Sequence, residues 1–187
     1  MTTAGLLTGD LVRLAALNPE TDAESFARWS RDSEYYRLDT TDPARMWSPR
    51  QTREFMDKDD QAEHPNSISL AIRTLDGDQV IGFIALDGIE WTHGDAWVGI
   101  GIGDRAFWGR GYGADAMRVM LRYAFVELNL FRVSLNVFEY NRRAIRSYEK
   151  CGFTVEGRLR AWIHRDGRLW DLIFMGILRE EWDRTRA

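Results

Sequence analysis

The chain is poor in residues that form covalent cross-links or metal sites. It holds one cysteine, Cys151, in 187 residues, which excludes an internal disulfide and any zinc site built on several cysteines. Its histidines, His64, His93 and His164, do not follow a metal-ligand spacing. We therefore expect no metal, and we expect Cys151 to be a small buried residue instead of a nucleophile.

Long apolar runs are also missing. No uninterrupted stretch approaches the roughly 20 residues that span a bilayer, and residues 1–13 lack a basic segment followed by an apolar one. The sequence therefore predicts a soluble, cytoplasmic protein without membrane contact. Its 187 residues and 44% hydrophobic content suit a single domain over residues 1–187.

Charge is distributed unevenly along the chain, although the net charge is only −4. Residues 18–64 are acidic on balance, and residues 105–187 are basic. An acidic surface favours a cationic partner and a basic surface favours an anionic one. The basic residues are spread over several predicted elements, so we expect no nucleic acid partner.

Hydrophobic periodicity predicts an α/β (α+β) fold, in which helices flank a mixed, mostly antiparallel sheet. The predicted strands are 11–17, 67–74, 79–91, 97–102, 132–138, 154–160, and 161–164 paired with 169–178. The predicted helices are one capped by Asp22, one starting at Ser48-Pro49 with Phe55 and Met56 facing inward, one from Ala114 to Leu128, and 142–151. Residues 34–48 are predicted to be irregular.

A glycine-rich turn, Gly109-Arg110-Gly111-Tyr112-Gly113, joins a predicted strand to a predicted helix. Glycines leave the N–H groups of a turn uncrowded, and a helix N-terminus attracts anions, so the turn is a candidate phosphate site. Its dinucleotide-type spacing is a weak indication, because antiparallel strands precede it instead of the repeated βαβ units of a Rossmann domain. Glu139, at the end of the next strand, keeps that alternative open. No Gly-Lys-Ser/Thr follows the turn, which excludes a Walker loop.

A second motif follows the strand at 132–138. Asn141 suits a helix N-cap whose side chain accepts a hydrogen bond from the Ala144 N–H. Tyr148 lies seven residues further on, two helical turns later, so both residues share nearly the same face. Taken alone, a capping asparagine and a packed tyrosine account for both positions.

Together the two motifs resemble the GNAT superfamily of acyl-CoA-dependent N-acyltransferases. The resemblance covers about residues 11–182 and is strongest over 99–153, where Trp108-Gly-Arg-Gly-Tyr-Gly113 precedes Asn141-x-x-Ala144-x-x-x-Tyr148-Glu-Lys-x-Gly-Phe153. The chain is most similar to the branch of ribosomal-protein N-acetyltransferases, which also includes spermidine acetyltransferases. None of these motifs specifies an acceptor.

The resemblance implies acetyl-CoA as co-substrate and an amine as acceptor, carried by a protein N-terminus, a polyamine or a small molecule. The strands at 99–102 and 132–138 would splay into a V-shaped slot, Asn141 would contact the pantetheine arm, and Tyr148 would protonate the departing thiolate as the catalytic residue. The implied cofactor-binding residues are Ile100, Ile102, Trp108, Gly109, Arg110, Gly111, Tyr112, Gly113, Ala114, Asn141 and Tyr148. The resemblance also leaves room for a homodimer.

One position departs from that branch. Many members carry a glutamate in the strand before the glycine turn, and here the residue is Trp97, which cannot accept a proton. Glu90, His93 and Asp95 are then candidate general bases, with loss of the proton to water as a further route. The same departure keeps a second interpretation open, a non-catalytic acyl-CoA-binding module on the same fold.

The acceptor side is predicted only by charge and aromatic content. The acidic balance of residues 18–64, with Tyr35 and Asp39, favours a cationic amine. Four aromatic residues of this part of the chain either line an acceptor pocket or form the core beneath the first helices, namely Trp29, Tyr35, Tyr36 and Trp47.

Overall fold

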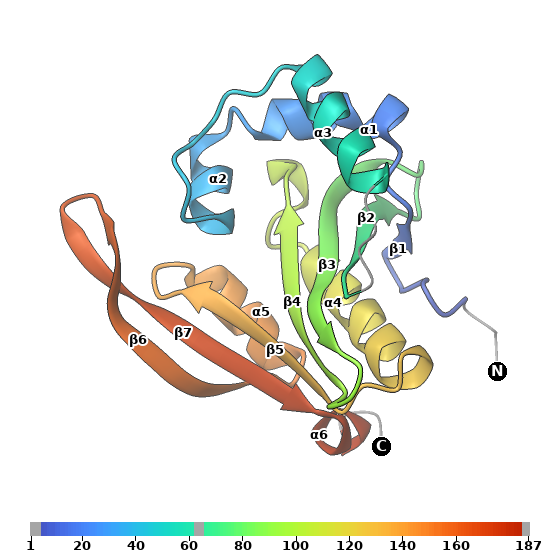
Figure 1. Ribbon diagram of the computed structural model, residues 1–187, viewed down its shortest axis with the longest axis vertical. Helices are drawn as coiled ribbons and strands as arrows, with labels where there is room; N and C mark the ends of the chain where they lie inside the picture. The colour runs from blue at the N-terminus through green and yellow to red at the C-terminus, as the bar shows by residue number, and fades with distance from the viewer. Residues whose placement is uncertain (1–4, 62–65, 185–187) are drawn as a thin grey trace.

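The computed structural model describes residues 5–61 and 66–184. In them, a seven-stranded sheet has the strand order β1-β2-β3-β4-β5-β7-β6, and every neighbouring pair is antiparallel except β4 and β5 (Figure 1). The strands are β1 (Val12–Ala15), β2 (Ile68–Thr74), β3 (Val80–Glu90), β4 (Asp95–Ile102), β5 (Arg132–Phe138), β6 (Thr154–Arg165) and β7 (Arg168–Leu178). The predicted mixed, mostly antiparallel sheet is confirmed.

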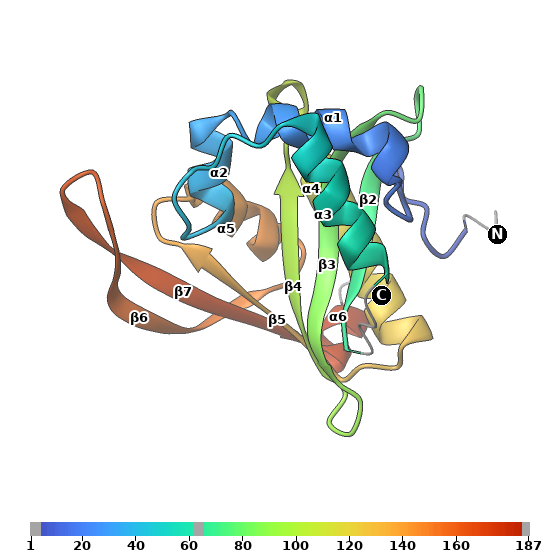
Figure 2. The same ribbon diagram turned by 45° about the horizontal axis from the view of Figure 1, so that its top comes forward.

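Helices cover both faces of this sheet. They are α1 (Pro19–Trp29), α2 (Ser33–Asp39), α3 (Pro49–Gln61), α4 (Tyr112–Arg122), α5 (Arg142–Lys150) and α6 (Arg179–Arg184), with a short 3-10 turn at Arg105–Phe107 and a π-helical extension of α4 at Tyr123–Glu127. Figure 2 shows α1 and α3 on one face and α4 on the other. None of the helices in residues 5–61 and 66–184 combines the length and the apolarity needed to cross a bilayer.

The main core lies between the sheet and the helices α4 and α5. Strand residues such as Ile84 and Leu135 pack there against Met117 and Met120 of α4, all nearly inaccessible to solvent. Apolar side chains at a spacing of three or four residues give α4 the single apolar stripe that this packing requires. Helix α4 is thereby fixed against β1, β3 and β4, and the glycine turn before α4 is held at one end of the sheet.

The two central strands separate beyond a short paired stretch. Pairing of β4 with β5 joins Asp95 to Arg132, Ala96 to Val133 and Trp97 to Ser134, and then ends. Figure 1 shows the two strands meeting at one end and diverging toward the other. Among the described residues, no strand pairs with β4 beyond Trp97 on this side, so the V-shaped slot implied by the resemblance is present.

The start of the first helix differs from the sequence prediction. Its N-cap is Asn18, whose side chain accepts a hydrogen bond from the Glu20 N–H at 3.0 Å, and Pro19 occupies the first helical position. Asp22, the predicted cap, lies inside the helix and is fully buried. It accepts hydrogen bonds from the Asn18 N–H at 2.9 Å and from the Arg73 guanidinium at 2.7 Å, which compensate its charge.

The segment predicted to be irregular begins with helix α2. Asp32 caps this helix by accepting hydrogen bonds from the N–H groups of Glu34 and Tyr35, at 3.0 and 3.1 Å. The remainder, up to Ser48, is without regular structure as expected. A helix of seven residues is too short for a periodicity signal, so its cap was the only local sign of it.

Two further expectations were wrong in part. Phe55 of α3 is 57% exposed and packs against Trp47, whereas Met56 faces inward as predicted. The predicted separate strands 154–160 and 161–164 form one strand, β6, whose pairing with β7 is irregular between Leu159 and Ile163. Ala161 takes a left-handed conformation there, with φ of 54°, which bends the strand without ending it. His64 lies outside the described residues.

Candidate active site

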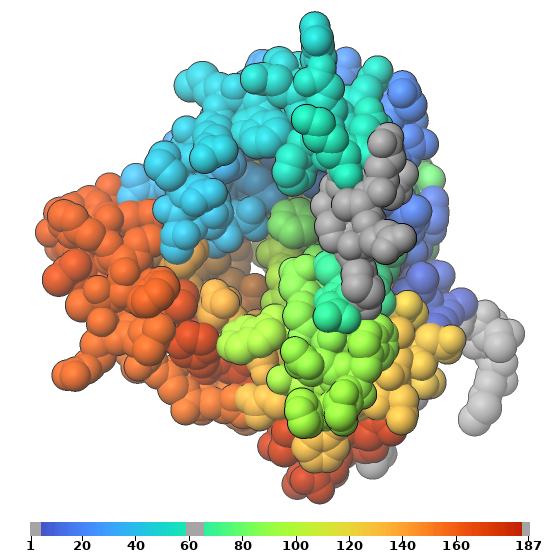
Figure 3. Space-filling model, in the orientation of Figure 1, coloured from blue at the N-terminus to red at the C-terminus, as the bar shows by residue number. Residues whose placement is uncertain are grey.

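A cavity of about 680 Å³ occupies the opening between β4 and β5. Its walls come from α2 and β3 on one side and from the glycine turn, α4, β5 and α5 on the other. Figure 3 shows the surface hollowed between the α2 segment, β4 and the β6–β7 hairpin. This volume lies within the range of small-molecule and cofactor sites, about 300–1,000 Å³.

The glycine turn has the backbone expected of an anion site. Gly109 and Gly111 take left-handed conformations, with φ of 70° and 93°, which favour glycine over residues with side chains. Gly111 is the N-cap of α4 and provides no side-chain cap, so the first N–H groups of the helix stay open to a ligand. Both glycines line the cavity.

Most of the predicted cofactor-binding residues lie together on this cavity. They are Ile100, Ile102, Trp108, Gly109, Gly111, Gly113, Ala114, Asn141 and Tyr148. The side chains of Arg110 and Tyr112 are not among the lining residues. Arg110 donates a hydrogen bond to the Ala106 carbonyl at 3.2 Å, and the Tyr112 ring packs edge-on against Phe107. A turn that enters a helix directs successive side chains to different sides, and these two side chains contact protein atoms outside the cavity lining.

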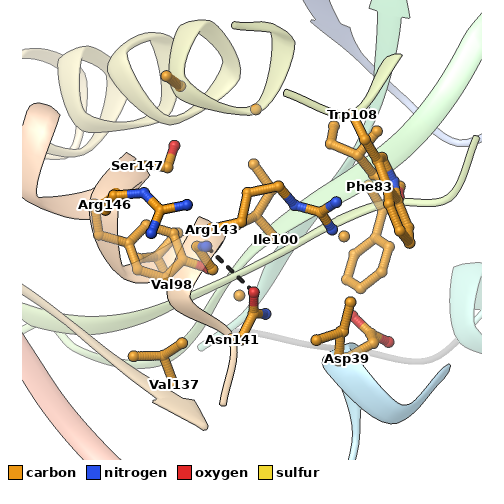
Figure 4. Close-up of a pocket in the computed structure, with 18 of the residues that line it drawn as sticks. Asp39, Phe83, Val98, Ile100, Trp108, Val137, Asn141, Arg143, Arg146 and Ser147 are labelled. Atoms are coloured by element: carbon orange, nitrogen blue, oxygen red, sulfur yellow. Dashed lines mark hydrogen bonds between the residues drawn. The ribbon is translucent and has the colours of Figure 1, made fainter. Parts of the chain in front are cut away.

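Asn141 serves as the predicted N-cap and also faces the cavity. Its Oδ1 accepts a hydrogen bond from the Ala144 N–H at 3.2 Å, drawn as a dashed line in Figure 4. This bond fixes the side chain and leaves the amide Nδ2 as a donor. Asn141 therefore combines the structural role with a position suited to a polar ligand group.

Tyr148 lies in the wall of the cavity, and its ring packs edge-on against Phe153. No partner for its hydroxyl is found among residues 5–61 and 66–184, so that group is available to a ligand. Burial, followed by the negative charge of Asp39, raises the pKa of Tyr148 above its ordinary value. The hydroxyl therefore stays protonated at neutral pH, as a proton donor must.

Four cationic side chains that the sequence prediction left out also line the cavity, namely Arg118, Arg143, Arg146 and Lys150. No ion pair to any of them is found in the described part of the chain. The guanidinium of Arg143 stacks over the Trp108 ring, 3.9 Å from its centre, and Arg146 lies beside Ser147 in Figure 4. The signal was available, because positions 143, 146 and 150 share one face of α5 by their spacing.

The three predicted candidates for the general base do not reach the cavity. Glu90, His93 and Asp95 lie at or beyond the closed end of the slot, where β3 turns into β4 and pairing with β5 begins. Trp97 lines the cavity near that end and packs edge-on against Phe174 of β7, with ring centres 5.9 Å apart. Its indole makes this position apolar.

Two other carboxylates line the cavity, Asp39 at the end of α2 and Asp87 on β3. Asp87 is exposed and accepts a hydrogen bond from the Ser67 hydroxyl at 2.7 Å. Asp39 keeps contact with solvent through the open cavity, yet surrounding protein atoms partly desolvate it and raise its pKa to about 6. Tyr35, also on α2, packs into the core beside Trp29 and also lines the cavity, whereas a role in an acceptor pocket stays a prediction.

Two predictions from the sequence concern unreactive groups. Cys151 is buried, and its Sγ lies 3.6 Å from the Ala114 carbonyl oxygen, as expected of a packed thiol. Within residues 5–61 and 66–184, no three His, Cys, Asp or Glu side chains gather in a way that could hold a metal ion.

Comparison with protein families places residues 12–154 in a family described as "Acetyltransferase (GNAT) domain". YdaF of Bacillus subtilis, named as a candidate ribosomal N-acetyltransferase, is 31% identical over 102 residues, which are 54% of this chain and 55% of that protein. Spermidine N(1)-acetyltransferase of Escherichia coli is 30% identical over 129 residues, 69% of this chain and 68% of that protein. Further curated N-acetyltransferases are matched over less than two thirds of their own length.

Among solved structures, the fold is similar to that of spermidine N-acetyltransferase from Vibrio cholerae, determined in complex with CoA and spermine. The TM-score is 0.79 at 24% identity, and the likeness covers 91% of this chain and 97% of the other. At this identity the likeness concerns the fold.

Proposed function

The chain belongs to the GNAT acetyltransferase family, and from that premise we propose that it transfers the acetyl group of acetyl-CoA to a primary amine. One observation carries the proposal. Pairing of β4 with β5 ends at Trp97, and the cavity opened there runs between the glycine turn and Tyr148. A strand edge with free backbone groups, an anion site and a protonated hydroxyl are the parts that binding and cleaving such a thioester requires.

The residues present fit the chemistry of acetyl-CoA. The N–H groups of the glycine turn and of the first turn of α4 would hold the pyrophosphate, and the cations of α4 and α5 would neutralise phosphate charge. Backbone groups of β4 at residues 98–102, together with the amide of Asn141, would bind the pantetheine arm. The bound thioester supplies an activated acetyl group and a thiolate leaving group.

The chain then has two tasks in the reaction. Backbone donors at the edge of β4 would stabilise the oxyanion that forms when the amine attacks the carbonyl carbon. The Tyr148 hydroxyl would give its proton to the departing sulfur, and it is suited to this because its raised pKa keeps it protonated. These roles rest on placement at the cavity, with the acetyl group bound near Tyr148.

We expect Gly111→Val to weaken acetyl-CoA binding at least roughly tenfold, equivalent to about 1.4 kcal/mol. The φ of Gly111 is 93°, which a β-branched residue adopts only with strain, and the added side chain would crowd the N–H groups at the start of α4. Titration calorimetry measures the change. Gly167→Val is the matched control, because Gly167 has φ of 68° at the tip of the β6–β7 hairpin, does not line the cavity, and has nothing within 4 Å of an added Cβ. Equal affinities in the folded Gly111 variant and the wild type would remove the turn from the binding site.

The acceptor is proposed to be a cationic amine, with polyamines as the first class to test. Asp39 and Asp87 line the side of the cavity formed by α2 and β3, and they would attract a substrate that carries more than one positive charge. The spermidine acetyltransferase of Escherichia coli, similar over 69% of this chain, supports the same class. Protein N-termini and small amines remain in the comparison set.

A thiol-release assay with acetyl-CoA and matched amines tests this proposal. We expect 1,5-diaminopentane to exceed pentylamine in kcat/KM by about tenfold, equivalent to about 1.4 kcal/mol, because the two differ only in the second ammonium group. The advantage should shrink as salt screens the attraction. Equal values at all salt concentrations would contradict a cationic acceptor. Acetyl-CoA binding without turnover of any amine would favour the non-catalytic module instead.

A further inference from the structure

The proposed transfer needs a proton acceptor. The strand position at which many relatives carry a glutamate is Trp97 here, and an indole cannot accept the proton. An amine with an ordinary pKa is an ammonium ion at neutral pH, and it must lose a proton before its nitrogen lone pair can attack. Resting on the proposed function, we propose that the carboxylate of Asp39 accepts this proton and is the general base of the reaction.

Asp39, at the end of α2, lies against β4, and this position supports the role. A Cβ added to Gly101 would lie 2.9 Å from Asp39 Oδ1 and 2.7 Å from the Tyr35 hydroxyl oxygen, so both oxygens approach the strand backbone at one point. Residues 35 and 39 share one face of α2 by their spacing of four. Because Gly101 has no side chain, α2 can bring the Asp39 carboxylate against β4 at this point. Figure 4 shows Asp39 beside Phe83 at the cavity.

Asp39 and Tyr148 face the same cavity from different helices, α2 and α5. The charge of Asp39 is felt at Tyr148, since it contributes to raising the pKa of that hydroxyl. A thioester bound between them would have a proton acceptor on the side from which the amine arrives and a proton donor near the sulfur. Asp39 would then act as the base and Tyr148 as the acid, because their environments differ.

The groups packed around Asp39 leave its carboxyl oxygens free to take a proton. Tyr35 is on its own helix, Tyr148 is on α5, and β4 and β3 present Gly101 and Phe83. The nearby cations are engaged elsewhere. Arg165 of β6 donates to the carbonyls of Arg37 and Thr40, and Arg143 stacks on Trp108. No hydrogen bond or ion pair to the Asp39 carboxyl is found within the described residues.

The step balances in protons and bonds. The ammonium group gives one proton to the Asp39 carboxylate, and the neutral nitrogen attacks the carbonyl carbon, so that a C–N bond forms. The C–S bond then breaks, and the sulfur takes the Tyr148 proton. The nitrogen of the new amide then loses its second proton. This proton passes through solvent to the Tyr148 oxygen and restores the hydroxyl. Asp39 releases its own proton to solvent, so one proton is set free for each acetyl group transferred.

The test compares Asp39→Asn with the wild type, using 1,5-diaminopentane or whichever amine the assay identifies as acceptor. The substitution keeps size and polarity but removes the basic group. We expect kcat to fall roughly 10²-fold at pH 7.5 with both substrates saturating, while the acetyl-CoA affinity measured by calorimetry stays unchanged and verifies the fold. Asp42→Asn is the matched control, because Asp42 is an exposed carboxylate three residues further along the chain that does not line the cavity, so kcat and its pH profile should stay as in the wild type.

The pH profile gives a readout that a structural role would not change. Asp39 accepts a proton only when ionised, so wild-type kcat/KM should rise with pH through the carboxyl pKa of about 6. In Asp39→Asn this limb should disappear, and activity should rise about tenfold per pH unit toward the pKa of the amine, as the neutral amine becomes available. Asp39→Glu should restore part of kcat together with the acidic limb.

Two results would overturn the proposal. One is an Asp39→Asn variant with wild-type kcat and an unchanged acidic limb. The other is a loss confined to the KM of the amine, which would make Asp39 a binding residue only. Failure of the proposed function looks different, since the wild-type protein would then bind acetyl-CoA and acetylate no amine at all.

Discussion

Replacing Tyr148 by phenylalanine is expected to lower the turnover rate roughly 10²-fold or more, the usual contribution of a positioned acid. The acetyl-CoA affinity should stay nearly unchanged. The phenyl ring keeps the packing against Phe153 and removes only the proton that the leaving sulfur takes. Protonation matters as the C–S bond breaks and little in the ground state, so kcat and kcat/KM should fall together. The measurement is acetyl transfer at saturating acetyl-CoA with a confirmed acceptor.

Tyr112→Phe is the matched control for this experiment. Tyr112 belongs to the glycine turn, but its ring packs against Phe107 and does not line the cavity, so loss of its hydroxyl should leave turnover unchanged. If Tyr148→Phe kept near-wild-type turnover with chemistry rate-limiting, Tyr148 would be a packed aromatic and nothing more. Weaker acetyl-CoA binding without a turnover defect would make its hydroxyl a cofactor contact.

Local sequence signals predicted the conformation of the glycine turn and the N-cap of α5. Gly109 and Gly111 were recognisable because a strand, a glycine-rich turn and a helix follow each other without interruption, and the structure gives both residues the left-handed backbone that requires glycine. Asn141 as N-cap is confirmed by its bond to the Ala144 N–H. Each of these features depends on residues that are only a few positions apart, so the sequence alone can indicate it.

The wall of the cavity formed by α2 and β3 depends on contacts between distant segments. The sequence indicated Tyr35 and Asp39 of this wall only through charge and aromatic content. Asp39 lies beside Gly101, more than sixty positions away, because α2 is positioned by long-range bonds such as that from the Tyr140 hydroxyl to the Arg37 carbonyl at 2.7 Å. The candidate bases Glu90, His93 and Asp95 are near Trp97 in sequence. The parallel pairing of β4 with β5 places that turn at the closed end of the slot, and no local pattern reveals it. The homodimer stays a prediction of the resemblance.

The cations of α5 lead to the second large expected effect. A double variant, Arg146→Gln with Lys150→Gln, should weaken acetyl-CoA binding by roughly 10²-fold. A hydrogen bond to a charged group contributes about 1.5–3 kcal/mol, and we expect the lower end of that range, roughly a factor of ten for each side chain, because both are exposed before the ligand binds. The wild-type affinity should also fall with rising salt, and that dependence should be weaker in the variant because fewer charges attract the phosphates. Titration calorimetry at two salt concentrations measures both effects.

Arg142→Gln is the matched control, since Arg142 is on the same helix but lies 3.8 Å from the Glu139 carboxylate and does not line the cavity. Dephospho-CoA, which lacks the 3′-phosphate, identifies the phosphate that is bound. If Arg146 and Lys150 contact the 3′-phosphate, wild type and double variant will bind dephospho-CoA equally. If they contact the pyrophosphate held at the glycine turn, the double variant will also bind dephospho-CoA more weakly than the wild type. An unchanged affinity for acetyl-CoA in the folded double variant would exclude both arrangements, because two cations that neutralise a bound phosphate cannot be removed without loss of attraction.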